Sequence, residues 1–477
     1  MLKKHSLLFC LIAAVVALSA CRTAPSNPSA TSSAAVDANA ANQIQAAFVV
    51  LGEQGQAQAR VITSASVCPA LTQDGVTSAM SIRALPATIA QRKTLSSPTD
   101  SKPSDFPVLT CEATLKTGVK VASVAGKTLA VPKAVPLKIL VVGDTGCRMK
   151  LADNYFQSCY DSDKWAFSTV AKSAATFAPD LVIHVGDYQY RENPCPAGNA
   201  ACADSPWGFG WDTWKADFFD PAAPLLSAAP WVLARGNHES CARAGQGWWR
   251  FMDPRGLQAG RDCNVEANDM TGDYSDPYAV PLGAGAQLIV FDSAKTASKP
   301  VAKTDPVYAI YAAQFKQVDR LAEQAPFSIF LEHHPILGFA PEKAKNSNVE
   351  VKPGNAALQS ILQDSHPQRL FAPNVQLLLA GHVHLFEAIT FETDHPMQIV
   401  SGNGGSSPDV DLPTQLSPQA TPFSGAKVAH FNSTSESGFM TMERASVTAT
   451  DWVMKSYDRN GKLMTTCTIS RGKQACN

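Results

Sequence analysis

Five short polar motifs between positions 143 and 384 contain the side chains best suited to bind metal ions. They are Gly143-Asp144-Thr145-Gly146, Gly186-Asp187-Tyr188-Gln189-Tyr190, Gly236-Asn237-His238-Glu239, Glu332-His333-His334-Pro335 and Gly381-His382-Val383-His384. Carboxylate, amide, imidazole and phenolate groups suit iron, zinc or manganese better than a thiolate-loving ion. Together the ordered motifs predict one two-metal site.

Each motif follows an apolar segment that is typical of a buried strand. These segments are 137–142, 181–185, 231–234, 327–331 and 375–379. A helix is expected over 165–177, which makes the first two strands a βαβ unit, and ligand sites in such sheets gather at the carboxyl ends of the strands. One Gly-Asp pair could be a simple turn. The pair His382 and His384 favours a metal site, because side chains two apart in an extended chain point the same way.

The motifs resemble those of the calcineurin-like metallophosphoesterase superfamily, and within it the purple acid phosphatases. The resemblance covers roughly residues 137–405. The broad superfamily carries a histidine two residues after the first aspartate, where this chain has Gly146. The purple acid phosphatase pattern instead has a tyrosine three residues after the second aspartate, where this chain has Tyr190. The loss and the gain together favour that subfamily.

The resemblance implies a role for seven side chains. The first metal, Fe(III), would be bound by Asp144, Tyr190 and His384; a second, divalent ion (Fe, Zn or Mn) would be bound by Asn237, His333 and His382; and Asp187 would bridge the two. Tyr188 is the alternative phenol, but it lacks the family spacing.

The implied fold is a four-layer α/β/β/α sandwich, and the implied reaction is hydrolysis of phosphate monoesters of small molecules. Two cations neutralise phosphate charge and lower the pKa of a water, whose hydroxide attacks phosphorus in line with the leaving oxygen. His238 would orient the phosphate or protonate the leaving group, although it could instead only support the metal ligands. A phosphodiesterase or nucleotide hydrolase is the first alternative, and a non-catalytic surface-binding protein is the second.

The substrate-facing residues are less well defined than the metal ligands. Several purple acid phosphatases have a histidine in the loop after the fourth motif, but residues 335–351 contain none and carry Lys343 and Lys345. The role of His334 stays open. Among the other histidines, we expect structural roles for His184, His366 and His430, and His395 is a weaker candidate for supporting the metal site. Four arginines flank motifs and could bind phosphate or form ion pairs: Arg148, Arg191, Arg235 and Arg243.

The first 43 residues predict an exported lipoprotein. Residues 1–20 read as a signal peptide whose apolar stretch is too short to span a membrane. Leu18-Ser19-Ala20-Cys21 resembles a bacterial lipobox, so lipidated Cys21 would anchor the protein in the cell envelope, and residues 21–43 would form a tether. Ordinary cleavage is the alternative. Of 12 cysteines, ten lie in the body of the chain and suggest disulfides between sequence neighbours: Cys68–Cys111, Cys147–Cys159, Cys195–Cys202, Cys241–Cys263 and Cys467–Cys476.

Length and composition indicate two domains. The 477 residues are 45% hydrophobic, which supports a real core. Short strands with Gly and Pro turns predict a small sandwich-like β domain over 44–136, and residues 137–477 would form the catalytic domain. A net charge of −1 does not favour a nucleic-acid partner. The oligomeric state is left open.

Overall fold

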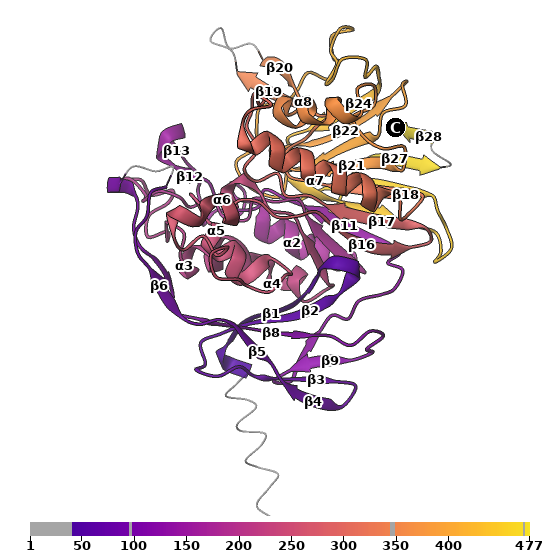
Figure 1. Cartoon of the computed structure of the whole chain (residues 1–477). Coiled ribbons are helices and arrows are strands. Elements are labelled where there is room, and N and C mark those ends of the chain that lie inside the picture. Colours follow the sequence, from indigo (N-terminus) through magenta and orange to yellow (C-terminus); the bar gives the residue numbers. More distant parts are fainter. Residues whose placement is uncertain (1–40, 95–97, 344–348, 471–472) are drawn as a thin grey trace, which may run out of the picture.

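The computed structural model describes residues 41–94, 98–343, 349–470 and 473–477 (Figure 1). The expected signal peptide, Cys21, most of the tether and Lys345 lie outside these residues. Within the described part of the chain, no helix has the length and apolar character required to cross a bilayer.

The first sheet contains eleven strands among the described residues. In sheet order they are β28 (Lys473–Cys476), β27 (Leu463–Ser470), β26 (Trp452–Asp458), β25 (Gly438–Glu443), β11 (Lys138–Val142), β14 (Leu181–His184), β15 (Trp231–Leu233), β1 (Ile44–Leu51), β2 (Ala57–Thr63), β8 (Leu109–Thr114) and β5 (Ser81–Ala84). The central strands β11, β14 and β15 are parallel. Their carboxyl ends therefore lie at one edge of the sheet, where the first three motifs begin.

The second sheet contains seven strands in the described chain. In order they are β16 (Tyr278–Gly283), β17 (Ala286–Val290), β18 (Phe327–Leu331), β21 (Val375–Ala380), β23 (Met397–Ser401), β22 (Phe386–Phe391) and β24 (Val428–Thr434). Strands β17, β18, β21 and β23 are parallel. The fourth and fifth motifs follow β18 and β21, so they also lie at carboxyl ends.

Apolar side chains between and outside the sheets create four layers. Inward-facing residues of both sheets, such as Val141 and Leu331, form one core. The outer face of the first sheet packs against helices through Phe167 and Phe218, and that of the second through Phe315 and Leu358. The helices of these outer layers are α2 (Phe167–Thr176), α3 (Trp211–Trp214), α4 (Asp220–Leu226), α5 (Gly245–Gly247), α6 (Asp269–Gly272), α7 (Pro306–Ala322) and α8 (Ala356–Ser365). The predicted α/β/β/α sandwich is confirmed.

The N-terminal strands continue the first sheet instead of forming sheets only of their own. Strand β1 pairs with β15 in parallel, and β2, β8 and β5 extend the sheet beyond it, at the bottom of Figure 1. A small sheet packs against them, composed of β10 (Lys127–Leu129), β9 (Ala122–Val124), β3 (Ala70–Gln73) and β4 (Val76–Ala79). The packing of two sheets resembles the expected sandwich, but the hydrogen-bonded sheet crosses position 136. A domain division there stays a prediction.

Two buried arginines join this N-terminal region to the segment after the third motif. Arg60 donates to the carbonyl of Phe251 at 2.6 Å, and Arg83 donates to the carbonyls of Trp249 at 2.6 Å and Arg255 at 2.7 Å. Both guanidinium groups also pair with Glu112, at 3.3 and 2.8 Å, which lowers the cost of burying their charge. The N-terminal strands therefore hold in place the segment that follows the third motif.

The ten cysteines of the described chain form the five predicted disulfides. The described residues also contain three two-stranded sheets, which pair β12 (Met149–Lys150) with β13 (Tyr155–Phe156), β19 (Phe339–Lys343) with β20 (Val349–Pro353), and β6 (Ala87–Ile89) with β7 (Ser104–Phe106).

Candidate metal centre

Three of the predicted ligands lie in left-handed backbone at the ends of parallel strands. The φ angles are 56° at Asp144, 59° at Asp187 and 70° at His382. This conformation costs roughly 1–3 kcal/mol for a residue with a side chain and persists where the surroundings enforce it, most often at functional sites. Each sharp turn directs its side chain back over the sheet edge.

The first group of ligand atoms surrounds the hydroxyl of Tyr190. This oxygen lies 2.9 Å from Asp144 Oδ1, 2.9 Å from Asp187 Oδ2 and 2.8 Å from His384 Nε2. His384 Nδ1 lies 2.6 Å from the carbonyl oxygen of Ser407, which fixes the ring with Nε2 toward the group. The four side chains are all buried.

The second group surrounds the amide oxygen of Asn237. Its Oδ1 lies 3.1 Å from His333 Nε2 and 3.0 Å from His382 Nδ1. His333 Nε2 is also 3.1 Å from Asp187 Oδ2, and its Nδ1 lies 2.9 Å from the carbonyl oxygen of Val185. Asp187 thus contacts both groups. The structure brings together all seven side chains predicted as ligands.

The donor set fits cations on chemical grounds. Two buried carboxylates, a phenol and imidazole nitrogens present their lone pairs to one another, and buried negative charge needs compensation. Burial, followed by the charges of Asp144 and Asp187, raises the pKa of Tyr190 well above its ordinary value. Burial also raises the pKa of Asp144. Tyr190 as phenolate therefore requires a cation beside it, and oxygen and nitrogen donors of this kind suit iron, zinc or manganese.

Tyr190 leaves no room for a side chain at position 146. A Cβ at Gly146 would lie 2.8 Å from the backbone nitrogen of Tyr190 and 2.9 Å from Cδ2 of its ring. Real Cβ atoms do not approach other atoms so closely, so a side chain at 146 excludes Tyr190 in its present place. The exchange inferred from the two motifs is therefore also a steric one.

His238 lies against the first group and is held by two charged residues. Its ring centroid is 3.8 Å from that of Tyr190, and its Nδ1 lies 2.8 Å from Glu192 Oε1. Arg243 pairs with Glu192 and places Nη2 2.6 Å from His238 Nε2. Burial, and next the Arg243 charge, lowers the pKa of His238 to about 4. These contacts fix the ring in one orientation.

Two buried acids that the motif analysis did not assign hold the motif loops in place. Glu239 accepts hydrogen bonds from the backbone nitrogens of Gly236, Asp187 and Tyr188 at 3.1, 3.1 and 2.9 Å. Asp217 accepts from the nitrogens of Cys147 and Tyr190 at 3.1 and 2.7 Å and also pairs with Arg191. Glu239 is the last residue of the third motif, so the sequence offered a signal for its role. Asp217 lies in a helical segment that carries no motif, so the sequence offered none.

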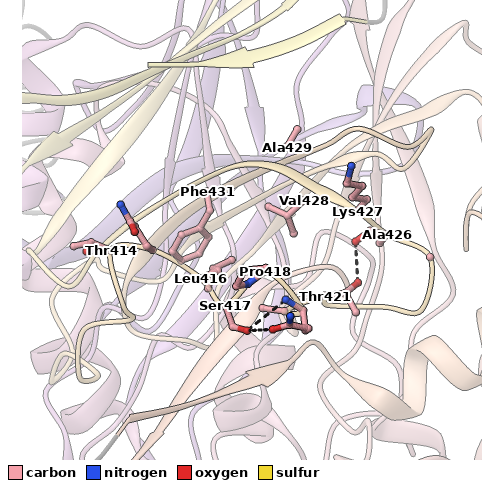
Figure 2. A pocket seen from close by; sticks show the side chains of 14 residues that line it. Thr414, Leu416, Ser417, Pro418, Thr421, Ala426, Lys427, Val428, Ala429 and Phe431 are labelled. Carbon is pink, nitrogen blue, oxygen red and sulfur yellow. Dashed lines mark hydrogen bonds between the residues drawn. The ribbon is translucent and has the colours of Figure 1, made fainter.

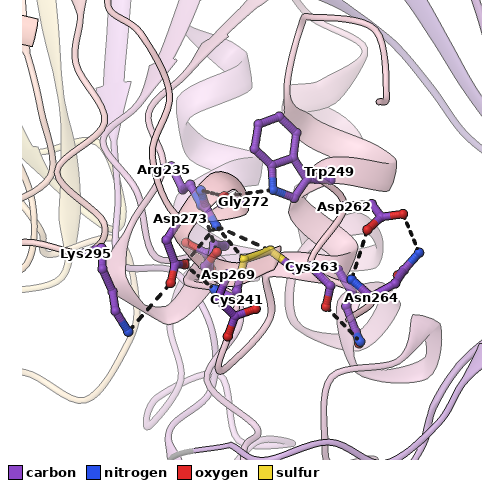
Figure 3. Close-up of a disulfide and its surroundings, with 12 residues drawn as sticks. Arg235, Cys241, Trp249, Asp262, Cys263, Asn264, Asp269, Gly272, Asp273 and Lys295 are labelled. Atoms are coloured by element: carbon purple, nitrogen blue, oxygen red, sulfur yellow. Dashed lines mark hydrogen bonds and ion pairs between the residues drawn. A yellow bond between two sulfur atoms is a disulfide. The ribbon is translucent and has the colours of Figure 1, made fainter. Parts of the chain in front are cut away.

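The loop after the third motif is tied down by the Cys241–Cys263 disulfide (Figure 3). Arg235 lies beside it, donating to the carbonyl of Gly272 at 2.7 Å and pairing with Asp273 at 3.6 Å. Asp273 Oδ1 also accepts from the nitrogen of Cys241 at 2.6 Å. Arg235 is therefore a structural arginine, as is Arg191.

The remaining histidines separate into supporting and distant residues. His334 lies next to the second group, with its ring 4.2 Å from that of His382 and its Nδ1 3.1 Å from Ser293 Oγ. His184 stacks on Tyr188 at 3.9 Å inside the core, as expected. His395 packs instead against Phe391 and Phe423 and makes none of the described contacts with the metal centre. His366 pairs with Asp319 at 2.9 Å, a structural contact.

A pocket of about 270 Å³ opens over the two ligand groups. Its lining consists of Arg148, Lys150, Asp187, Asn237, His238, Arg243, Ala340, His382, Val383, His384 and Asp409. A larger cavity of about 620 Å³ lies within residues 414–431 (Figure 2). Lys427 is the one charged side chain in its described lining, which includes no carboxylate or imidazole. The smaller pocket is therefore the one equipped for metal chemistry.

Comparisons with known proteins give the family of the chain and a related fold. A family model described as calcineurin-like phosphoesterase matches residues 137–386, more than half of the chain. The structure of a purple acid phosphatase, PPD1, from yellow lupin (Lupinus luteus) seeds aligns with a TM-score of 0.56 at 16% identity, covering 89% of this chain and 74% of that one. The structure of PhoD aligns with a TM-score of 0.46 at 10% identity, covering 91% of each chain.

No curated protein matches the chain. The family match extends from the first strand before Asp144 to the end of the fifth motif, so it includes every predicted ligand. The lupin structure shows that the fold is similar to that of a purple acid phosphatase. The chain belongs to the calcineurin-like phosphoesterase family and is a phosphoesterase with the metallophosphoesterase fold.

Proposed function

We propose that the protein hydrolyses phosphate monoesters at a two-metal centre of the purple acid phosphatase type. Fe(III) would be held by Asp144, Tyr190 and His384, and a divalent iron, zinc or manganese ion by Asn237, His333 and His382. Asp187 would contact both. When bound, the ions supply positive charge for the phosphoryl oxygens and a water of lowered pKa.

The observation that carries this proposal is the position of Asp187 between two sets of donors. Its Oδ2 is 2.9 Å from the Tyr190 hydroxyl and 3.1 Å from His333 Nε2. One carboxylate shared by two sets of oxygen and nitrogen donors is the arrangement that a bridging ligand needs. The phenol belongs to only one of the sets, which makes the two positions chemically different and favours a mixed-metal pair.

The protein side chains around the pocket would orient the substrate. His238 faces the pocket with its ring fixed by Glu192 and Arg243. From this position it can hydrogen-bond to the phosphate or pass a proton to the leaving oxygen. Because the His238 ring is buried and already held in place, it loses little conformational entropy when the substrate binds.

Turnover of two matched esters tests the proposal. The purified protein, loaded with iron and then zinc or manganese, is assayed with p-nitrophenyl phosphate and with bis-p-nitrophenyl phosphate. We expect the monoester to be cleaved with the higher kcat/KM. A higher value for the diester would reassign the site to phosphodiesters, and no turnover of either ester by metal-loaded protein would contradict the proposed reaction.

We also propose that the protein is exported and lipid-anchored through Cys21. Five disulfides support an oxidising compartment. Labelling of expressing bacteria with a palmitate analogue should mark the wild-type protein and fail to mark Cys21→Ala. Equal labelling of both proteins, or none of either, would contradict the anchor.

A further inference from the structure

Two cationic side chains of one hairpin line the pocket in addition to the metal centre. Arg148 and Lys150 flank Met149 at the start of the β12–β13 hairpin. Met149 is buried, and side chains two apart in extended chain share a face, so Arg148 and Lys150 both reach the pocket. The seven predicted metal ligands include neither of them.

The hairpin is fixed directly to the segment that carries Tyr190. The nitrogen of Met149 donates to the carbonyl of Tyr190 at 3.0 Å. The backbone of Arg148 is held by Gln157, which accepts from its nitrogen through Oε1 at 2.9 Å and donates to its carbonyl at 2.8 Å. The Cys147–Cys159 disulfide closes the same hairpin. The two cations are thus positioned before any substrate arrives.

The charge of these cations is only partly compensated. Asp153, which does not line the pocket, lies 3.1 Å from Arg148 Nε and 3.4 Å from Lys150 Nζ. Asp153 therefore serves both cations, Asp409 is a further carboxylate in the pocket lining, and no hydrogen bond joins Arg148 Nη1 to another of the described residues. The nearby Asp409 accepts from the backbone nitrogen of His384 at 2.8 Å. The guanidinium keeps donors available toward the pocket.

We propose that Arg148 and Lys150 bind a second anionic group of the substrate, a phosphate or carboxylate on the leaving group. The inference rests on the proposed function and assigns its substrate class. Metal ions would neutralise the phosphate undergoing reaction. Arg148 and Lys150, which form what we call the pocket rim, are therefore suited to bind a further anion. A guanidinium presents paired donors that match the geometry of both phosphate and carboxylate oxygens.

Binding of three non-hydrolysable phosphonates to the metal-loaded protein tests the inference without depending on turnover. Methylphosphonate offers one anionic group, phosphonoacetate adds a carboxylate, and methylenediphosphonate adds a second phosphonate. Calorimetry should show that at least one of the latter two binds about tenfold or more tightly relative to methylphosphonate, since hydrogen bonds between charged groups have about this value. The better of them identifies the second group.

The variant Arg148→Gln/Lys150→Gln should lose about tenfold of that preference. The matched control Arg459→Gln/Lys303→Gln removes two cations from exposed ion pairs with Asp163 and Asp364 outside the pocket, and it should keep the preference. Metal content is measured in each protein. No preference in the wild type, or an equal loss for all three phosphonates in the pocket variant, would overturn the inference. Turnover of p-nitrophenyl phosphate by the wild type tests the proposed reaction separately.

Discussion

The metal centre and the pocket rim are built in different ways. The candidate ligands come from the carboxyl ends of parallel strands in two sheets, and Asp144, Tyr190 and His333 are completely buried. The rim cations come from a short hairpin, and the Arg148–Asp153 pair is 24% and 32% exposed. The strand ends are part of the sheets, whereas the hairpin lies outside them and tolerates substitution of its exposed side chains without disturbing them. We infer that the sheets determine the reaction and the hairpin determines which ester is accepted.

Removal of the shared carboxylate should produce the largest effect. Asp187→Ala takes away a carboxylate whose Oδ2 contacts side-chain donors of both ligand groups, so we expect loss of bound metal and at least about a 10³-fold fall in kcat/KM, since metal ions supply several kcal/mol of charge stabilisation. Metal analysis and a p-nitrophenyl phosphate assay measure both. Asp364→Ala, which removes an exposed carboxylate outside the pocket, is the control. Unchanged turnover in a folded Asp187→Ala protein would refute the two-metal account.

Replacement of His238 should have the next largest effect and should reveal its role. We expect His238→Ala to retain metal and to lose about 10²-fold in kcat, within the range for a positioned proton donor. The loss is measured across aryl and alkyl phosphates whose leaving groups differ in pKa. A loss that grows with the leaving-group pKa indicates proton donation, and a constant loss indicates phosphate orientation. No loss with any ester would leave His238 only a structural role.

Glu239→Gln should weaken the centre without removing a ligand. Its carboxylate accepts from the backbone nitrogens of Asp187, Tyr188 and Gly236, and an amide has only one oxygen to do so. We expect about a tenfold loss of metal affinity, as found for residues that orient ligands. Competition with a chelator measures it. Affinity equal to that of the wild type would show that the turn holds its shape without Glu239.

Removal of the Cys147–Cys159 disulfide should have the smallest effect on monoester turnover. Cys147→Ser/Cys159→Ser removes a 12-residue cross-link and should cost about 3 kcal/mol of unfolding free energy. Because this disulfide closes the Arg148 hairpin, the preference for a second anionic group should fall as well. Cys241→Ser/Cys263→Ser, with a separation of 22, should cost a similar amount but keep the preference. If both variants showed the same preference for a second anionic group, the hairpin would not determine that preference.

The convergence of the seven candidate ligands could be predicted from the sequence because each motif carries its information locally. Each of the five motifs follows its own apolar strand, and parallel strands bring such ends together. The disulfides were predictable for a similar reason, since partners such as Cys195 and Cys202 are neighbours in the chain. The pairing of β1 with β15 was not, because it joins residues far apart in sequence. Asp217 was missed for the same reason: its partners, Cys147 and Tyr190, lie in other segments.

The identity of the bound metals tests the central claim most directly. Purified wild-type protein is analysed for metal and its visible spectrum is compared with that of Tyr190→Phe, in which only the phenol oxygen is lost. We predict two metal ions per chain, including iron, and a visible tyrosinate–iron absorption band that disappears in Tyr190→Phe. A colourless wild-type protein containing only zinc or manganese would contradict the purple acid phosphatase assignment, and a protein that binds a single ion would contradict the two-metal centre.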